Sequence, residues 1–191
     1  MINYKHKFIF VHIPRTGGTS LEKQFNYNGD RDGRKHLSFN QYSKLLNGLS
    51  FRDYFKFTFI RNPWDIMISN YLDAGWYSSS KPGRGGQIGY HSRKSLKYFL
   101  EHYKPAKHEH GDALLDFFSP EEVDFIGRFE NRSNDLQFIS SKIGLKLDSS
   151  VVQRKNSHKK HYTKYYNQET RDMVANRYSK DINTFGYKFG D

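Results

Sequence analysis

Residues that could bind or move a charged group gather in two short stretches of the sequence. In the first, Arg15 is followed by a run of small residues between a β-branched and aromatic segment and a segment with helical spacing. A turn between a strand and a helix directs bare backbone N–H groups, and the positive end of the helix dipole, at an anion. A turn selected only for its geometry is the alternative. We predict a phosphate cradle made of Pro14, Arg15, Thr16, Gly17, Gly18, Thr19 and Ser20.

The second stretch follows another apolar and aromatic run. Arg61 stands at the end of that run, and Ser69 lies eight positions later, in the next predicted helix. A guanidinium and a hydroxyl so placed can share one phosphate, with the arginine acting as a bidentate fork. Taken alone, this pair is better explained by an exposed arginine and a solvent-facing helix serine.

The elements that would position these residues alternate between strands and helices. Strands are predicted over 8–13, 54–60 and 123–126, and helices over 38–46, 65–72, 92–103, 112–118, 133–143 and 168–178. This alternation predicts one α/β domain over residues 1–191, a P-loop-like three-layer fold with a central, mostly parallel sheet flanked by helices. Ligands bind beyond the carboxyl ends of the strands in such sheets, which places both polar stretches along one edge.

Composition narrows the range of partners and compartments. The chain has 191 residues, no cysteine and a net charge of +11, with 31 Lys and Arg against 20 Asp and Glu. The positive charge favours polyanions such as nucleic acid, a phosphorylated nucleotide or an acidic glycan. The lack of cysteine excludes disulfides and thiolate metal sites. The sequence contains no apolar segment of about 18 residues, the length that a membrane anchor needs. We therefore expect a cytoplasmic protein.

The phosphate cradle differs from the standard ATP-binding loop. That loop requires G-x-x-x-x-G-K-[ST], whereas here no glycine stands four residues before the Gly17–Gly18 pair and no lysine directly precedes Thr19. The second predicted strand ends in Arg-Asn-Pro, which offers no carboxylate for magnesium. We therefore expect no metal, and a reaction in which the protein's own cations balance the charge of the phosphates.

Taken together, the two stretches resemble the sulfotransferases that use 3′-phosphoadenosine 5′-phosphosulfate (PAPS). That family's 5′-phosphosulfate loop is similar to H-I-P-K-T-G-G-T-S, and residues 12–20 read HIPRTGGTS. Its 3′-phosphate motif is similar to R-N-P-x-x-R-x-x-S-x-Y, and residues 61–71 read RNPWDIMISNY. The segments 124–131 and 165–187 look like later landmarks of the family. Within that family, the sequence resembles the carbohydrate-acting branch that includes the heparan sulfate 2-O- and 6-O-sulfotransferases. It looks like a soluble microbial or viral relative of these enzymes.

The resemblance implies transfer of a sulfonate group from PAPS to a hydroxyl or amine, with a carbohydrate as the favoured acceptor and no metal. It implies that Arg15 stabilises the leaving group, that Arg61 and Ser69 hold the 3′-phosphate, and that Lys155 and Lys159 belong to a late basic loop over the nucleotide. Two positions depart from the family pattern, because Arg15 replaces the usual lysine and Ile66 replaces the second arginine. Arginine is a rigid fork and lysine a mobile point charge, so the first change is not neutral.

A base must also remove the acceptor proton, and we favour His36. A neutral imidazole has an ordinary pKa near 6.5, which suits proton uptake at neutral pH, and the segment KHLSF resembles the stretch where the 2-O-sulfotransferase branch keeps its catalytic histidine. Glu22, on the first helix, is the rival base. His12 is expected to pack at the strand end. Residues 73–120, where the resemblance is weakest, are predicted to form an acceptor-binding insertion or lid.

Two other functions stay open at the level of sequence. A nucleic-acid-binding module could use the basic, aromatic surface, although the resemblance leads us to expect no nucleic-acid partner beyond the nucleotide donor. A nucleotide kinase-like phosphate-binding protein would share the cradle but would require an acidic metal ligand. Oligomeric state is not indicated by any pattern in the sequence.

Overall fold

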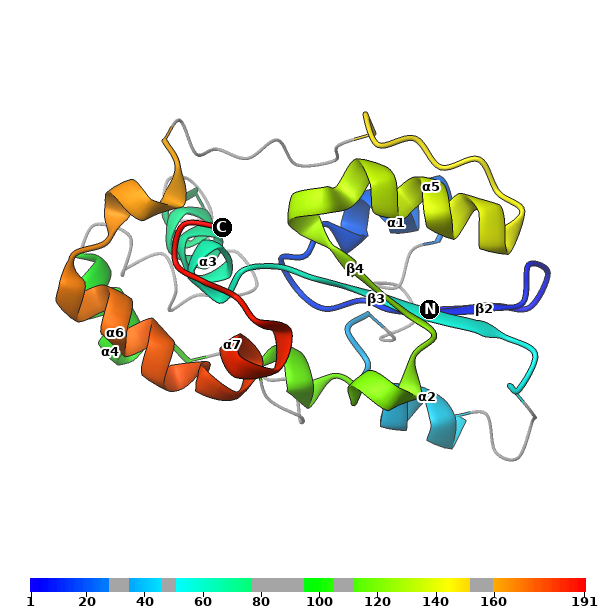
Figure 1. Ribbon diagram of the computed structural model, residues 1–191, viewed down its shortest axis with the longest axis horizontal. Coiled ribbons are helices and arrows are strands. Elements are labelled where there is room, and N and C mark those ends of the chain that lie inside the picture. The colour runs from blue at the N-terminus through cyan, green and yellow to red at the C-terminus, as the bar shows by residue number, and fades with distance from the viewer. Residues whose placement is uncertain (28–34, 46–50, 77–94, 105–111, 152–159) are drawn as a thin grey trace. The chain divides into compact units, whose positions relative to one another are not determined.

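A computed structural model describes residues 1–27, 35–45, 51–76, 95–104, 112–151 and 160–191 (Figure 1). The chain divides into two compact units. The first comprises Met1–Arg61 and Ala106–Lys155, and the second comprises Asn62–Pro105 and Asn156–Asp191. The boundary at residues 61 and 62 therefore falls inside the second of the two polar stretches.

The first unit is built on a four-stranded sheet. Its strands are β1 (Ile2–Asn3), β2 (Phe8–Val11), β3 (Phe55–Ile60) and β4 (Phe125–Arg128), in the spatial order β1-β2-β3-β4. β2 pairs with β3, and β3 with β4, in parallel, whereas the short β1 is antiparallel to β2. The prediction of a mostly parallel sheet is thus confirmed.

Helices cover both faces of this sheet. α1 (Gly18–Gln24) and α5 (Arg132–Ile143) lie on one face, and α2 (Phe39–Leu45) lies on the other (Figure 1). Because side chains alternate along a strand, the aromatic residues at alternate positions of β2 and β3 point to the same side. There they pack with Leu21 of α1 and with three residues of α5 in the core formed by Met1, Phe8, Phe10, Leu21, Phe57, Phe59, Leu136, Ile139 and Ile143.

Three single-turn 3₁₀ helices complete the described part of the first unit. They are η2 (Leu114–Asp116), η3 (Pro120–Glu122) and η4 (Phe129–Asn131). α5 follows η4 directly and ends at Gly144, whose φ of 66° is the left-handed conformation that closes many helices. The sequence predicted this helix and its glycine stop.

The described part of the second unit is helical. Its elements are α3 (Pro63–Trp76), α4 (Leu96–His102), η5 (Tyr162–Tyr165), α6 (Gln168–Arg177) and α7 (Ser179–Phe185). Pro63 is the first residue of α3, where its missing N–H costs no helical hydrogen bond. Ser95 caps α4 by accepting a hydrogen bond from the Tyr98 N–H at 3.2 Å.

The C-terminal residues of the second unit pack against the start of α3. Phe189 makes edge-on ring contacts with Trp64, Tyr162 and Tyr166, with ring centroids 5.5 to 5.7 Å apart. The Asn62 side-chain amide donates a hydrogen bond to the Lys188 carbonyl at 2.9 Å. The residues after α7 are therefore part of the folded unit.

Two element predictions are corrected, and two further elements were not predicted. β1 was not predicted, because two residues are too short for a periodic pattern. The segment after Tyr178, for which no helix was predicted, forms α7, and Gly186, at φ 66°, ends it. The helix expected over 112–118 is only the turn η2. The third parallel strand begins two residues later than predicted, because Asp124 contacts Lys56 through its backbone N–H and its carboxylate and the ladder starts at Phe125.

Candidate functional site

The predicted phosphate cradle is a tight connection between β2 and α1. Thr16 donates its hydroxyl hydrogen bond to the Ile13 carbonyl at 2.8 Å, which folds the chain back at the strand end. Gly17 precedes α1 with a φ of 85°, a backbone conformation that glycine adopts without the strain of a Cβ. The Ser20 N–H donates to the Gly17 carbonyl at 3.2 Å and starts the helix. The strand, turn and helix succeed one another as predicted.

Arg15 occupies a strained position in this turn. Its φ of 68° is left-handed, which costs a non-glycine residue about 1–2 kcal/mol. Its carbonyl oxygen accepts a hydrogen bond from Nη1 of Arg61 at 2.9 Å. The cation predicted to act on the leaving group is therefore held in an unusual backbone conformation by a second cation from the end of β3.

Arg61 is buried, with 3% of its surface exposed. Its guanidinium lies 4.1 Å from the centre of the Phe129 ring. The same ring would lie 3.1 Å from a Cβ placed on Gly17. Phe129 is thus a platform that contacts both the phosphate cradle and the predicted phosphate-binding arginine, and the two polar stretches meet through Arg61.

The partner that sequence analysis gave to Arg61 belongs to the other unit. Ser69 lies on α3 and is half-buried, whereas Arg61 is the last residue of the first unit. A phosphate shared by these two residues stays a prediction. Lys155 and Lys159, and residues 77–94 and 105–111 of the predicted acceptor insertion, lie outside the described residues.

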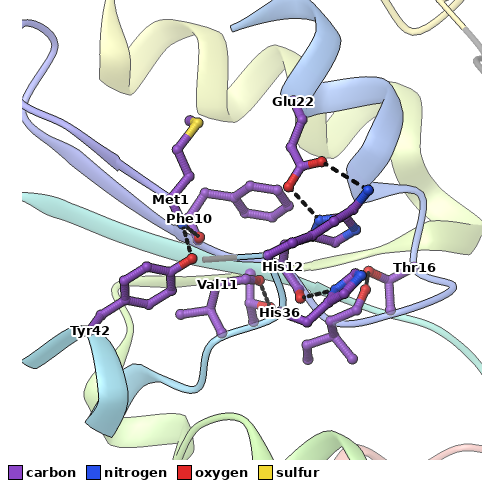
Figure 2. A network of polar contacts seen from close by, with 11 residues as sticks. Met1, Phe10, Val11, His12, Thr16, Glu22, His36 and Tyr42 are labelled. Atoms are coloured by element: carbon purple, nitrogen blue, oxygen red, sulfur yellow. Dashed lines mark hydrogen bonds and ion pairs between the residues drawn. The ribbon is translucent and has the colours of Figure 1, made fainter. Parts of the chain in front are cut away.

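A cluster of four polar side chains lies next to the cradle, and we name it the strand-end cluster: His12, Glu22, Lys35 and His36. Figure 2 shows its members His12, Glu22 and His36. The Nδ1 atom of His12 lies 2.7 Å from Oε1 of Glu22, and both residues are buried. The Nζ atom of Lys35 lies 3.8 Å from the other oxygen, Oε2. Glu22, 4% exposed, therefore directs both carboxylate oxygens at basic side chains.

His36 joins this cluster from a distant part of the chain. Its Nδ1 atom lies 2.9 Å from the His12 carbonyl oxygen, and the two imidazole rings are 4.3 Å apart between centroids. Its φ of 65° is a second left-handed, non-glycine conformation. The predicted base is therefore held at the end of β2, beside the phosphate cradle, and it is half-buried.

Gly18 explains how His12 fits beneath the cradle. A Cβ on Gly18 would lie 2.1 Å from Cδ2 and 2.4 Å from Nε2 of His12. The imidazole therefore packs directly on the backbone of the first residue of α1, and only glycine leaves room for it. The expectation that His12 packs at the strand end is confirmed, and its pairing with Glu22 is a contact that sequence analysis missed.

The N-terminal amine is a further buried polar group near this cluster (Figure 2). It donates hydrogen bonds to the Phe10 carbonyl at 2.6 Å and to the Tyr42 hydroxyl. Burial lowers the pKa of the Met1 amine from 8.0 to about 4, although the negative charge of Glu22 opposes this shift. In a chain that begins at Met1, we therefore expect a neutral amine at pH 7.

Neither Phe129 nor Lys35 was predicted as a site residue. Phe129 directly follows the last strand, as Arg61 follows β3, so adjacent parallel strands bring both residues to one edge. Lys35 is the neighbour of the predicted base in the sequence. Its position before His36 was the one available signal for its contact with Glu22.

Within the ranges given above, no three His, Asp or Glu side chains come together as the ligands of a metal ion would. In the same part of the chain, no helix is both long and apolar enough to cross a membrane.

Comparisons with known proteins agree with this architecture. The family model described as "Sulfotransferase family" matches residues 1–188. The chain is similar in structure to the mouse sulfotransferase SULT7A1 complexed with PAP, with a TM-score of 0.57 and 10% sequence identity over 95% of this chain and 86% of that chain. None of the curated protein sequences compared with the chain matches it. The structural likeness, at this identity, supports the fold.

Proposed function

Because the chain belongs to the sulfotransferase family, we propose that it transfers a sulfonate group from PAPS to a hydroxyl or amine of an acceptor, with a carbohydrate as the favoured acceptor. The observation that carries the proposal is the hydrogen bond from Arg61 to the Arg15 carbonyl. It joins the motif for the 5′-phosphosulfate to the motif for the 3′-phosphate. A nucleotide with phosphates at both ends is the donor that these two motifs would select.

The donor would be held mainly by groups of the cradle. Backbone N–H groups of residues 16–20 and the hydroxyls of Thr19 and Ser20 are the candidate ligands of the 5′-phosphate. Arg15, immediately before them, would balance the charge that develops on the leaving phosphate oxygen. Ser69, Lys155 and Lys159 remain the predicted further ligands of the nucleotide.

The reaction itself is a single in-line displacement. The acceptor oxygen forms a bond to sulfur while the bond between sulfur and the phosphate oxygen breaks, and adenosine 3′,5′-bisphosphate (PAP) leaves. The acceptor proton passes to His36 as general base. His36 suits this role better than Glu22, because the Glu22 carboxylate is buried and directed at His12 and Lys35.

Thermal unfolding with PAPS, PAP and ATP plus magnesium tests the donor. A ligand at 100 times its dissociation constant stabilises a protein by about 2.7 kcal/mol, so PAP and PAPS should raise the melting temperature clearly and ATP much less. Arg15→Ala should reduce the shift, whereas Lys180→Ala, which removes an exposed cation of α7, should not. No shift with millimolar PAP would contradict the proposal.

The alternative of a nucleic-acid-binding module has its own signature. Binding to single strands would weaken steeply with salt and would survive Arg15→Ala.

Transfer of radioactive sulfonate from PAPS to a panel of glycans, amines and phenols would identify the acceptor class. Transfer to glycans alone would support a carbohydrate acceptor, and transfer only to other hydroxyls would exclude it.

A further inference from the structure

Glu22 contacts His12, whose carbonyl is bonded to His36, and Lys35, the residue before His36 in the chain. Its Oε1 atom lies 2.7 Å from Nδ1 of His12, whose carbonyl contacts His36. Its Oε2 atom lies 3.8 Å from Nζ of Lys35, which precedes His36 in the chain. The buried Glu22 carboxylate is thus connected to His36 in two ways, through His12 at the strand end and through Lys35, the adjacent residue.

The contact between His36 and His12 determines where the proton of His36 resides. A backbone carbonyl can only accept a hydrogen bond, so Nδ1 of His36 must donate to it. A neutral imidazole carries a single N–H, which leaves the lone pair of His36 on Nε2. A general base needs such a lone pair, and here geometry assigns it to one nitrogen.

The His12 carbonyl can take this role because it lies just beyond the sheet. The pairing of β2 with β3 ends at Val11 and Thr58, and the Thr58 hydroxyl donates to the Val11 carbonyl at 2.8 Å. The next carbonyl, that of His12, accepts from His36. The position of this carbonyl depends on how the rest of His12 is held. The His12 ring lies between Glu22 and the backbone of Gly18.

His36 has a particular need for external support. Its left-handed backbone conformation is unfavourable by about 1–2 kcal/mol for a residue with a Cβ. A conformation of this kind persists only where surrounding contacts enforce it. The contacts through His12 and Lys35 are such constraints, and both lead to Glu22.

We propose that Glu22 is a positioning residue which, through His12 and Lys35, keeps the His36 imidazole in the Nδ1–H tautomer with its basic lone pair on Nε2. This inference rests on the proposed function for the identity of the reaction, but the tautomer itself can be measured without any substrate. It assigns Glu22, the rival candidate for the base, a role one step removed from the acceptor.

The first test is the tautomer of His36 in the unmodified protein. Long-range ¹H–¹⁵N coupling patterns of ¹⁵N-histidine-labelled protein distinguish the two neutral tautomers, at about two pH units above the ordinary histidine pKa of about 6.5. The chain has nine histidines, so the spectrum of His36→Ala assigns the signal. An Nδ1–H signal supports the proposal, and an Nε2–H signal overturns it.

The second test removes the carboxylate while keeping its shape. In Glu22→Gln, the His36 signal should shift to a mixture of tautomers, and kcat should fall by roughly 10–100-fold, the usual effect of losing a group that orients a functional histidine. The dissociation constant for PAP should change far less than kcat, because the Glu22 carboxylate is directed at His12 and Lys35. Glu121→Gln, an exposed carboxylate on η3, is the matched control and should change neither quantity.

A third variant protects the test against misfolding. Lys35→Met removes one of the two connections and leaves the pair of His12 and Glu22 in place, so a smaller change of the same kind is expected. An unchanged tautomer in folded Glu22→Gln, or in Lys35→Met if Glu22→Gln does not fold, overturns the proposal. A wild-type protein that has the expected tautomer but neither binds PAP nor uses PAPS would instead contradict the proposed function.

Discussion

The stretch around Arg15 lies in the first unit and the residues after Arg61 lie in the second, and the two are held in place by different kinds of contact. The strand-end cluster of the first unit consists of polar side chains that are joined by directional contacts next to the cradle. In the second unit, the residues that follow Arg61 are held by an aromatic cluster, which we define as Trp64, Tyr162, Tyr166 and Phe189. Here rings pack edge to face.

The difference matters because the two kinds of contact fail differently. A buried polar contact depends on charge and on the position of each proton, and an unmatched partner costs about 1–3 kcal/mol. Ring packing depends on volume and shape. The aromatic cluster also has polar contacts, such as the neutral hydrogen bond from the Tyr166 hydroxyl to the Trp64 carbonyl at 2.8 Å. Burial raises the pKa of Tyr166, which keeps that donor protonated.

The largest expected effect is a pH dependence confined to the first unit. In a chain that begins at Met1, the amine has a folded-state pKa of about 4 and an unfolded value near 8.0. Between these values the unfolded chain binds more protons, so stability should rise with pH from about 5 to 8, by at most about 1.4 kcal/mol per unit. Urea unfolding at several pH values measures it. Acetylation of the amine, which prevents protonation, should flatten the dependence, and a fall in stability over this range would contradict it.

The next effect is on turnover. Arg15→Ala should lower kcat by about 10²–10³-fold, the usual loss when a donor to a developing negative charge is removed. The protein should still fold, because the hydrogen bond from Arg61 is accepted by the backbone carbonyl of residue 15, which the substitution keeps. Sulfonate transfer and circular dichroism would be measured on the same sample. Arg15→Lys, which restores the family's usual residue, should retain most of the activity; equal losses in both variants would show that charge is not the reason.

Gly18→Ala tests the tight contact beneath the cradle. The added Cβ would meet the His12 ring at 2.1 Å, so the imidazole must move away from Glu22. We expect a loss of about 1–3 kcal/mol in the free energy of unfolding, as for overpacked cores, with weaker PAP binding. Calorimetry in the presence and absence of PAP measures both. Gly190→Ala, where nothing lies within 4 Å of the added atom, is a comparison at a glycine of the other unit, although its φ of 110° adds backbone strain.

Phe189→Ala should act on the second unit. It removes the ring that contacts Trp64, Tyr162 and Tyr166, but Phe189 is only half-buried. A loss of about 1–2 kcal/mol is therefore expected, below the range for a fully buried phenylalanine. Phe189→Leu should recover part of it, because leucine restores apolar volume but neither the ring contacts nor the cation–π contact with Arg171, whose guanidinium lies 4.9 Å from the ring centre. The pH dependence of stability should stay as in the wild type, and a changed dependence would remove the distinction between the regions.

The smallest effect is expected at an exposed ion pair of the second unit. Lys97 Nζ lies 2.5 Å from Oε1 of Glu169, and both side chains are about half exposed. Water and salt screen such a pair, so Lys97→Ala should leave the melting temperature within experimental error at physiological salt. A clear destabilisation would mean that charge contacts also matter in this unit.

Much of the fold was predictable because it depends on local pattern. Apolar and aromatic runs identify β2 and β3, and the helix closed by Gly144 follows from spacing and a glycine stop. α7 and β1 were missed, since one is a polar segment and the other a two-residue pair with β2. Their formation depends on contacts that no local window contains.

The sequence by itself determined the order of strand, turn and helix around Arg15, the parallel sheet and the membership of the chain in its family. Only the tertiary structure decided that Arg61 donates a hydrogen bond to the carbonyl of Arg15. It also decided that the two carboxylate oxygens of Glu22 face His12 and Lys35. The reason is physical. Local patterns specify which face of an element is apolar, whereas the partner of a buried polar group is chosen by segments that meet only when the chain has folded.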